Sequence, residues 1–293
     1  MRKSSVYLPD ALKGALAAAA SATGRSEAEL IRDAVEREVR RCRPAPPEAA
    51  GRARRPLPSA PCLVGVGVGP GDPALVTVAA REVLRAADRV LTASADPAAV
   101  GRAEAVVRAV DPDLDVERVV LDIGGDRRAR RSALDAAAAR VVHCLDDGEL
   151  VAFAVLGDPH LWSPWPGLRR AVATLRPAAA ATAVVPGIMA WQDLAARTGT
   201  VVAEDDERVV LVAVGDDPAV VCDPAGDART TVVGYRGGAG LPAVAAALGE
   251  RAADAVVGEL LGQPGERAVP LARAASRPAS YLATTIVPAR RPG

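Results

Sequence analysis

Aromatic residues, histidine and cysteine are scarce in this sequence. Half of its 293 residues are hydrophobic but only 2% are aromatic, so we expect an aliphatic core and many helices. The two histidines are His143 and His160, and the four cysteines lie far apart with no C-x-x-C pair among them. Such spacing argues against a structural zinc site and against a disulfide framework. We therefore predict isolated thiols and no metal site.

Long apolar runs and an N-terminal signal core are also lacking. No apolar run approaches the roughly 18 residues that cross a membrane, and the chain opens on an alternating stretch. We therefore expect a cytoplasmic protein. The net charge is zero, but residues 1–60 hold 12 Lys/Arg and 7 Asp/Glu, a net charge of +5, and the remainder carries −5. A basic first part is typical of an arm for an anionic partner.

Residues 1–43 have the pattern of one strand followed by two short helices. Alternation predicts a strand over Lys3–Leu8, and Pro9 suits the first turn of a helix that Gly24 ends. Ser26 and Glu29 form a capping-box pattern at the start of the second helix. So few elements cannot bury a sufficient core alone, and a lone strand leaves an unpaired edge. Pairing of two chains would solve both problems.

The residues S-V-Y-L-P-D-A-L and G-R-S-E-A-E-L-I-R-D-A-V in this stretch resemble the ribbon–helix–helix family of DNA-binding repressors. The resemblance implies paired strands in the major groove, with alternate outward side chains touching bases. By alternation these are Lys3, Ser5 and Tyr7. Since only one of the three is charged, a dimerisation module without DNA contacts remains the alternative. Residues 44–61, rich in proline and arginine, read as an extended linker at a domain boundary.

Residues 62–293 read as two α/β domains, 62–205 and 206–293. Short apolar strands alternate with helical segments in the first, which favours a mainly parallel sheet. We expect strands at 62–64, 89–92, 116–121, 150–156 and 181–185, and helices at 73–87, 97–110 and 127–145. In the second, we expect strands at 209–214, 231–235, 255–260 and 281–287, and a helix at 241–251.

Three loops at the ends of predicted strands carry unusual chemistry. The first, G-V-G-V-G-P-G-D at 65–72, fits neither the dinucleotide fingerprint nor a phosphate loop. The second is L-G-D-P-H-L-W-S at 156–163, and the third is V-V-P-G-I-M-A-W at 184–191. Loops at the carboxyl ends of parallel strands converge on one crevice, where such sheets bind ligands. Asp158 is either a polar anchor there or a turn former, and Trp162, Trp165, Met189 and Trp191 either line an apolar slot or belong to the core.

Together the three motifs resemble the tetrapyrrole (corrin/porphyrin) methylase family over about 62–293. The resemblance implies a two-domain α/β methyltransferase, usually a homodimer, that binds S-adenosyl-L-methionine in the cleft between its domains and acts on a tetrapyrrole. It places the cofactor contacts at Pro70, Gly157, Asp158, Leu161, Met189 and Ala190, and at Tyr235 or Arg236 in the second domain. No catalytic residue is identified by it.

Within the family, the opening motif and D-D-E-R-V-V-L-V-A at 205–213 are most similar to precorrin-2 (carbon-20) methyltransferase of cobalamin biosynthesis. The acid that the uroporphyrinogen branch carries after its second strand is missing near Ala93, and residues 62–293 contain no lysine. The uroporphyrinogen reaction is therefore disfavoured. His160 and Trp162 alter the second motif, which has tyrosine at the position of Trp162, and this bears on substrate preference.

The acidic side chains of a tetrapyrrole require cationic groups in the protein. The densest cluster of arginines consists of Arg127, Arg128, Arg130 and Arg131. This cluster either binds those side chains or is a solvated helix face. We expect a methyltransferase that acts on a cobalamin precursor, fused to a ribbon–helix–helix dimer. The rival hypothesis is a transcriptional regulator whose methylase-like body senses a tetrapyrrole or S-adenosylmethionine without turnover.

Overall fold

The computed structural model describes residues 7–41, 57–121, 127–177, 181–215, 217–274, 279–280 and 282–291. Contacts between residues divide the chain into two compact units, Met1–Pro56 and Leu57–Gly293. The break falls within the predicted linker at 44–61, most of which lies outside the described residues. The boundaries expected from the sequence at 43, 61 and 205 stay predictions.

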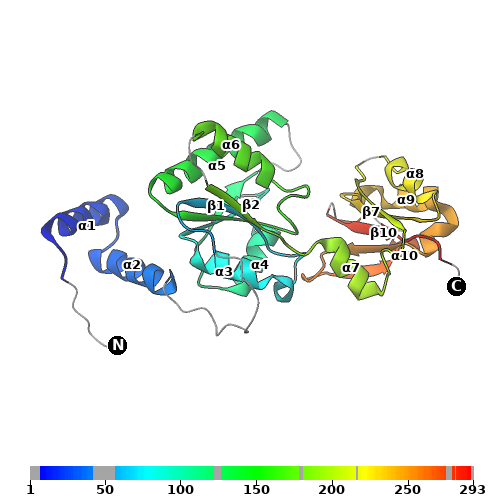
Figure 1. The fold of residues 1–293 in the computed structure, drawn as a ribbon, viewed down its shortest axis with the longest axis horizontal. Coiled ribbons are helices and arrows are strands. Elements are labelled where there is room, and N and C mark those ends of the chain that lie inside the picture. Colours follow the sequence, from blue (N-terminus) through cyan, green and yellow to red (C-terminus); the bar gives the residue numbers. More distant parts are fainter. Residues whose placement is uncertain are drawn as a thin grey trace. The chain divides into compact units, whose positions relative to one another are not determined.

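The first unit contains the two expected helices, α1 (Asp10–Thr23) and α2 (Glu27–Arg41) (Figure 1). Gly24 adopts the left-handed conformation, with φ of 67°, and ends α1 as predicted. The capping box of α2 is confirmed, because Ser26 N–H donates to Glu29 Oε2 at 2.9 Å and Glu29 N–H to Ser26 Oγ at 3.3 Å. No residue of α1 is buried. The apolar side of this helix therefore lacks a packed core within the described chain.

The expected strand Lys3–Leu8 falls mostly on residues outside the described range, and so do Lys3 and Ser5. Tyr7 is described and is 97% exposed, and residues 7–9 form no strand.

The second unit begins with a five-stranded parallel sheet, as the alternation of strands and helices predicted. Its strands run in the order β3-β2-β4-β1-β5, and every neighbouring pair is parallel. They are β1 (Cys62–Gly67), β2 (Arg89–Ser94), β3 (Val116–Val120), β4 (Leu150–Val155) and β5 (Ala181–Val185). Every residue of β1 and β4 is buried, which fits central strands covered on both faces.

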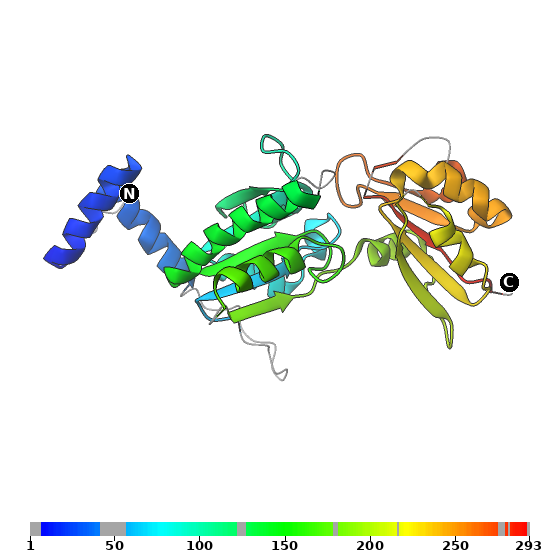
Figure 2. The ribbon, with the colours of Figure 1, turned by 90° about the horizontal axis from the view of Figure 1, so that it is seen from above.

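Helices cover both faces of this sheet (Figures 1 and 2). Apolar side chains of α3 (Val78–Ala86) and α4 (Arg102–Val110) form a core with one face, and those of α5 (Arg127–Asp146) and α6 (Trp165–Leu175) form a core with the other. Trp165 is fully buried in the second core, where its ring lies over Gly65. Of the two interpretations of Trp165, the core one is therefore confirmed.

The second sheet is mixed and runs in the order β6-β7-β10-β8-β9. Only β6 and β7 are parallel. Its strands are β6 (Arg208–Ala213), β7 (Thr230–Tyr235), β8 (Val256–Glu259), β9 (Arg267–Pro270) and β10 (Thr284–Val287). One face packs against α8 (Ala219–Ala225), α9 (Leu241–Leu248) and α10 (Leu271–Ala274), and the other against α7 (Ala190–Thr198) through Leu194. The helix that follows the third motif thus packs on the second sheet.

Several predicted bounds were wrong for local reasons. The helix expected over 73–87 is a 3-10 turn at Pro73–Leu75 followed by α3, because Thr77 caps a new helix through its side chain. The helix expected over 97–110 begins only at Arg102. The helix expected over 241–251 is α9 followed by a 3-10 helix, Gly249–Ala253. Five elements were not predicted, namely the helices α6, α7, α8 and α10 and the strand β9.

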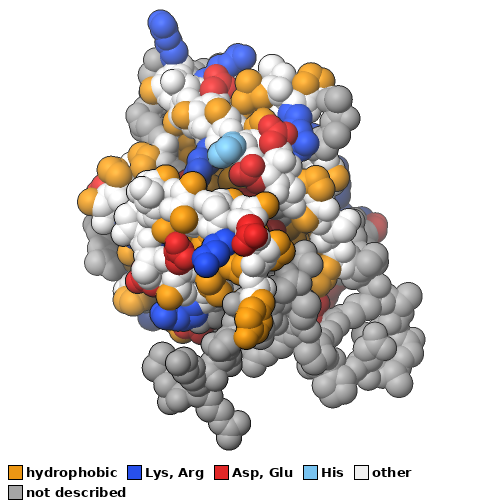
Figure 3. Space-filling model, turned by 90° about the vertical axis from the view of Figure 1, so that its left-hand side faces the viewer, with side chains coloured by type: hydrophobic (Ala, Val, Ile, Leu, Met, Phe, Trp, Pro, Cys, Tyr) orange, Lys and Arg blue, Asp and Glu red, His pale blue; other side chains and the backbone are white. Residues whose placement is uncertain are grey.

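Charged side chains of both signs are dispersed among small and apolar ones on the face shown in Figure 3. Among the described residues, no helix is long and apolar enough to cross a bilayer. Within the same ranges, no group of three or more His, Cys, Asp or Glu side chains is placed to hold a metal ion. Cys62, Cys144 and Cys222 are free thiols, and Cys42 lies outside the described residues.

Candidate active site

The three glycine-containing loops meet at the carboxyl edge of the parallel sheet, as expected. Gly67 ends β1, Gly157 follows β4 and Gly187 follows β5. A Cβ atom added to Gly67 would lie 2.5 Å from both Gly157 O and Gly187 N, and one added to Gly187 would collide with Gly157 O. The three backbones are therefore in direct contact, and only glycine allows so close an approach.

Hydrogen bonds tie the same loops together. Gly157 N–H donates to Gly69 O at 2.8 Å, and Gly187 N–H donates to Asp158 Oδ2 at 3.2 Å. The other carboxylate oxygen of Asp158 accepts from His160 N–H at 2.8 Å. Asp158 thus forms the turn of its own loop and also links it to the next. These contacts support the interpretation of Asp158 as a turn former, and its role as a polar anchor for a ligand stays a prediction.

The predicted cofactor-binding residues lie in these loops. Pro70 is buried in the first, Gly157, Asp158 and Leu161 lie in the second, and Met189 and Ala190 lie where the third enters α7. The Met189 sulfur would contact a Cβ atom at Gly157, at 3.5 Å, so the second and third loops pack side by side. Their role in binding a cofactor stays a prediction.

Tyr235, the predicted contact from the second sheet, lies at the end of β7 and packs against Trp162. The ring centroids are 5.0 Å apart and the planes are tilted by 56°. Trp162 and Arg236 both have positive φ, 49° and 61°, and Arg236 Nη2 donates to Trp162 O at 2.7 Å. Left-handed backbone at residues other than glycine is costly and often marks a functional site. Trp191 packs at the edge of the core around Leu194.

The Tyr235 hydroxyl is buried and has no hydrogen-bond partner among the described residues. Burial raises the pKa of this phenol far above its ordinary value, and the nearby backbone of Trp191 opposes the shift without forming a well-aligned hydrogen bond. The phenol is therefore neutral at any physiological pH. An unpartnered buried hydroxyl is a group that a bound ligand can satisfy.

The opening loop also packs closely against the second sheet. A Cβ atom on Gly71 would collide with Leu261 O, and one on Gly262 would collide with Asp72 N. Arg197 on α7 reinforces this contact from the side, pairing with Glu266 at 2.6 Å and approaching Asp72 at 3.9 Å. The first motif is thus enclosed between its own sheet and the loop that follows β8.

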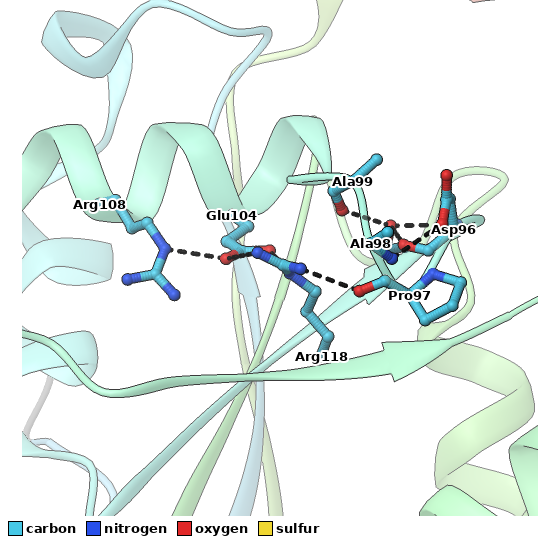
Figure 4. Close-up of polar contacts among 8 residues, drawn as sticks. Asp96, Pro97, Ala98, Ala99, Glu104, Arg108 and Arg118 are labelled. Carbon is cyan, nitrogen blue, oxygen red and sulfur yellow. Dashed lines mark hydrogen bonds and ion pairs between the residues drawn. The ribbon is translucent and has the colours of Figure 1, made fainter.

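A buried carboxylate, absent from the sequence predictions, fixes the loop after β2. Glu104 on α4 is fully buried, and its oxygens accept from Arg118 Nε at 2.5 Å and from Arg108 Nε at 2.8 Å (Figure 4). Arg118 Nη1 also donates to Pro97 O at 3.0 Å. The hydrogen bond from Arg118 is the main cause of the lowered pKa of Glu104, and Arg108 adds to it while burial opposes both.

This network binds the loop before α4 to β3. Its signal in the sequence is an acid at 104 within the apolar stripe Ala103, Val106 and Val107, because an acid on a buried helix face needs partners. The arginine cluster predicted from the sequence lies on another helix, α5. Arg128, Arg130 and Arg131 lie exposed at the start of α5, and the side chain of Arg127 is outside the description.

Residues 62–275 match the family model of the Tetrapyrrole (Corrin/Porphyrin) Methylases. The chain belongs to this family. Its members are methyltransferases that use S-adenosylmethionine as methyl donor, in the pathways to cobalamin and sirohaem. Residues 5–41 match the model of the ribbon–helix–helix proteins of the copG family. The expected fold class, a two-sheet methylase fold behind a ribbon–helix–helix module, is confirmed.

Solved structures of similar fold come from several branches of this family. A cobalamin synthesis related protein (CobF) from Corynebacterium diphtheriae is 18% identical, with a TM-score of 0.57, over 78% of this chain and 99% of that one. Cobalt precorrin-4 methyltransferase, CbiF, is 19% identical with a TM-score of 0.57, over 77% and 94%. Uroporphyrin-III-C-methyltransferase from Thermus thermophilus is 21% identical with a TM-score of 0.53, over 77% and 91%.

No curated protein sequence matches the chain significantly. At such low identity the solved structures establish the fold and leave the substrate open, so the expected assignment to precorrin-2 stays a proposal.

Proposed function

We propose that the protein transfers a methyl group from S-adenosylmethionine to a carbon of a tetrapyrrole, with precorrin-2 as the substrate. The observation that carries this proposal is the contact of the three loops at the carboxyl edge of the parallel sheet. Such an edge is where open α/β sheets bind their ligands. The family match over 62–275 supplies the class of reaction.

The residues at this edge fit S-adenosylmethionine. The cofactor combines an adenosine with a zwitterionic methionine, so it needs backbone groups, a carboxylate and apolar walls. The glycine loops bring backbone close, Asp158 supplies a carboxylate, and Met189 and Trp162 supply apolar surface. The unpartnered Tyr235 hydroxyl is a further polar group at the end of β7. Pro70, Gly157, Leu161 and Ala190 complete the proposed set.

The protein contributes to the reaction by holding the substrate and the cofactor in position. The sulfonium of the bound cofactor supplies an activated methyl group, so the protein needs no nucleophile of its own. Backbone contacts among the loops hold their geometry, Trp162 and Tyr235 shelter the site from water, and the network of Glu104 fixes the neighbouring loop. Holding an electron-rich carbon at near-attack distance is the main source of acceleration in such a site.

Binding of S-adenosylhomocysteine, the product that the cofactor becomes after methyl transfer, tests the proposed site. Isothermal titration calorimetry should give one site per chain for the unmodified protein. Substitution of Met189 by Ala should weaken the affinity about tenfold, because burial of one apolar side chain is worth roughly 1.5–3 kcal/mol. An unmodified protein that fails to bind S-adenosylhomocysteine would overturn the assignment of the site.

A second proposal concerns the first unit. The match of residues 5–41 to the ribbon–helix–helix model and the exposed helix α1 support a module that pairs two chains. We propose that it also binds DNA through Lys3, Ser5 and Tyr7, and that the protein is a homodimer. Pairing without DNA contacts is the alternative, and regulation of transcription by a body that senses its ligands without turnover is the rival function. A sedimentation measurement that finds only monomers would exclude every one of these proposals for the module.

A further inference from the structure

Arg102 is the first residue of α4 and directly follows the loop that the Glu104 network fixes. Its Nη2 atom donates to Ser280 Oγ at 2.7 Å, across 178 positions of sequence. Within the described ranges no carboxylate lies at ion-pair distance from it. Arg102 is only partly exposed. A guanidinium that is half-buried with a single neutral partner keeps most of its five N–H donors available.

Ser280 connects Arg102 to a second arginine through one carboxylate. Ser280 N–H donates to Glu259 Oε2 at 2.8 Å, and Glu259 Oε1 lies 2.5 Å from Arg267 Nε. The side chains of Glu259 and Arg267 are 11% and 15% exposed. Despite the short distance, Arg267 Nε and Nη2 are buried and make no aligned hydrogen bond with any described residue. Arg267 thus forms an ion pair with Glu259, while its Nε and Nη2 donors lack an aligned acceptor among the described residues.

The charges of this cluster do not cancel. It contains two guanidinium groups and one carboxylate, which leaves one positive charge in a poorly hydrated place. Burial lowers the pKa of Arg102, and the charge of Glu259 only partly opposes the shift. A buried charge without a counter-charge is costly. An anionic ligand that bound here would neutralise the remaining positive charge.

The cluster adjoins the candidate active site. A Cβ atom on Gly101, beside Arg102, would lie 2.9 Å from Ala93 O, so Arg102 stands at the carboxyl end of β2. Glu259 ends β8, two residues before Leu261, whose carbonyl oxygen contacts Gly71 of the opening loop. The end of β2 therefore places Arg102 at the edge of the sheet to which the three loops belong, and the loop after β8 brings Glu259 close to the opening loop from the second sheet.

We propose that Arg102 and Arg267 bind a carboxylate side chain of the tetrapyrrole substrate, with Ser280 holding Arg102 in position. This inference rests on the proposed function, because it assigns part of the same site. Each biosynthetic tetrapyrrole of this kind carries acetate and propionate groups, and guanidinium is the side chain that pairs with carboxylate in bidentate geometry.

The test compares Arg102→Gln with Arg102→Lys and with the control Arg81→Gln, which removes an exposed arginine on α3. Fluorescence titration with uroporphyrin, a porphyrin with carboxylates on every ring, should give a Kd about tenfold higher for Arg102→Gln. That factor is the loss expected for one charge-assisted hydrogen bond. Arg102→Lys should be intermediate and Arg81→Gln unchanged. Affinity for S-adenosylhomocysteine should stay within about twofold throughout, as expected for a group that touches only the substrate.

A second measurement uses the unmodified protein. Phenylglyoxal labels accessible arginines, and mass spectrometry should find Arg102 protected by uroporphyrin but not by S-adenosylhomocysteine. Equal uroporphyrin affinity for Arg102→Gln, or equal labelling with and without the porphyrin, would overturn the inference while leaving the proposed function intact. Absence of S-adenosylhomocysteine binding by the unmodified protein would instead contradict the proposed function itself.

Discussion

Asp158 accepts a hydrogen bond from the backbone N–H of Gly187 at 3.2 Å, so the loop after β4 holds the loop after β5. Because the same carboxylate also accepts from His160 N–H, Asp158→Ala leaves two loop amides without their acceptor. We expect affinity for S-adenosylhomocysteine to fall at least tenfold, since a hydrogen bond to a charged group contributes roughly 1.5–3 kcal/mol. Calorimetry measures the effect directly.

Asp158→Asn keeps one acceptor oxygen, so its affinity for S-adenosylhomocysteine should lie between those of the unmodified protein and Asp158→Ala. The control is Asp135→Ala, which removes an exposed carboxylate from α5 and should bind as the unmodified protein does. Equal affinity for Asp158→Ala and Asp135→Ala would show that the link between the loops does not matter for the cofactor.

Gly187→Ala should disrupt the site more severely than any side-chain deletion in the loops. Its Cβ atom would collide with Gly157 O and come within 2.9 Å of Gly67, and all the obstructing atoms are backbone. The loops must then separate, so we expect loss of S-adenosylhomocysteine binding and a melting temperature several degrees lower, from a cost of about 1–3 kcal/mol.

Gly240→Ala provides the matched comparison, because the nearest atom to its added Cβ would be Gly215 O at 3.6 Å. It should melt and bind normally. Normal binding by Gly187→Ala would contradict the tight packing of the three loops.

The three motifs were predictable from the sequence because each is a strand end with glycine or proline at a fixed place. The contact between Gly67, Gly157 and Gly187 follows from parallel pairing once the strand order is known. Arg102, Glu259 and Ser280 were not predictable, because their pairing depends on how the loop after β8 reaches the end of β2. The residues come from distant parts of the chain, and no local pattern links them.

Glu104→Ala should destabilise the second unit by about 2 kcal/mol. Loss of a buried pair costs roughly 3–5 kcal/mol, and we reduce this because the side chains of Arg118 and Arg108 stay 27% and 43% exposed. Glu117→Ala is the control on the neighbouring strand β3, since its pair with Arg140 is exposed and should contribute less than about 1 kcal/mol. Urea unfolding measures both variants.

The same carboxylate predicts a pH dependence. Arg118 lowers the pKa of Glu104 below its ordinary value of 4.5, so the folded state binds this proton less readily than the unfolded state. Its contribution is complete above pH 4.5 and is lost as the pH falls through the lowered folded value. The stability difference between the unmodified protein and Glu104→Ala should therefore shrink below pH 4.5. A difference that stays constant down to pH 3 would contradict the ion pair.

Tyr7→Ala tests the first unit as a DNA-binding module. Tyr7 is almost fully exposed, so its loss should leave the fold unchanged. We expect affinity for a duplex selected from a random pool to fall roughly tenfold, since a base contact is worth about 1–3 kcal/mol. The affinity of the unmodified protein should also decline steeply with salt, because its basic arm neutralises phosphates. Fluorescence anisotropy measures both.

Arg81→Gln, a change in the other unit, should bind the same duplex normally. Absence of any salt-sensitive binding by the full chain would leave dimerisation as the function of this module.

An assay of methyl transfer is the decisive test of the proposed reaction. The full chain is incubated with precorrin-2 and S-adenosylmethionine carrying a labelled methyl group, and the products are examined by mass spectrometry. We expect a tetrapyrrole heavier by one labelled methyl group, formed in step with S-adenosylhomocysteine, and no product from Gly187→Ala. Tight binding of S-adenosylmethionine with no label in any tetrapyrrole would contradict the proposed reaction and favour a ligand-sensing body.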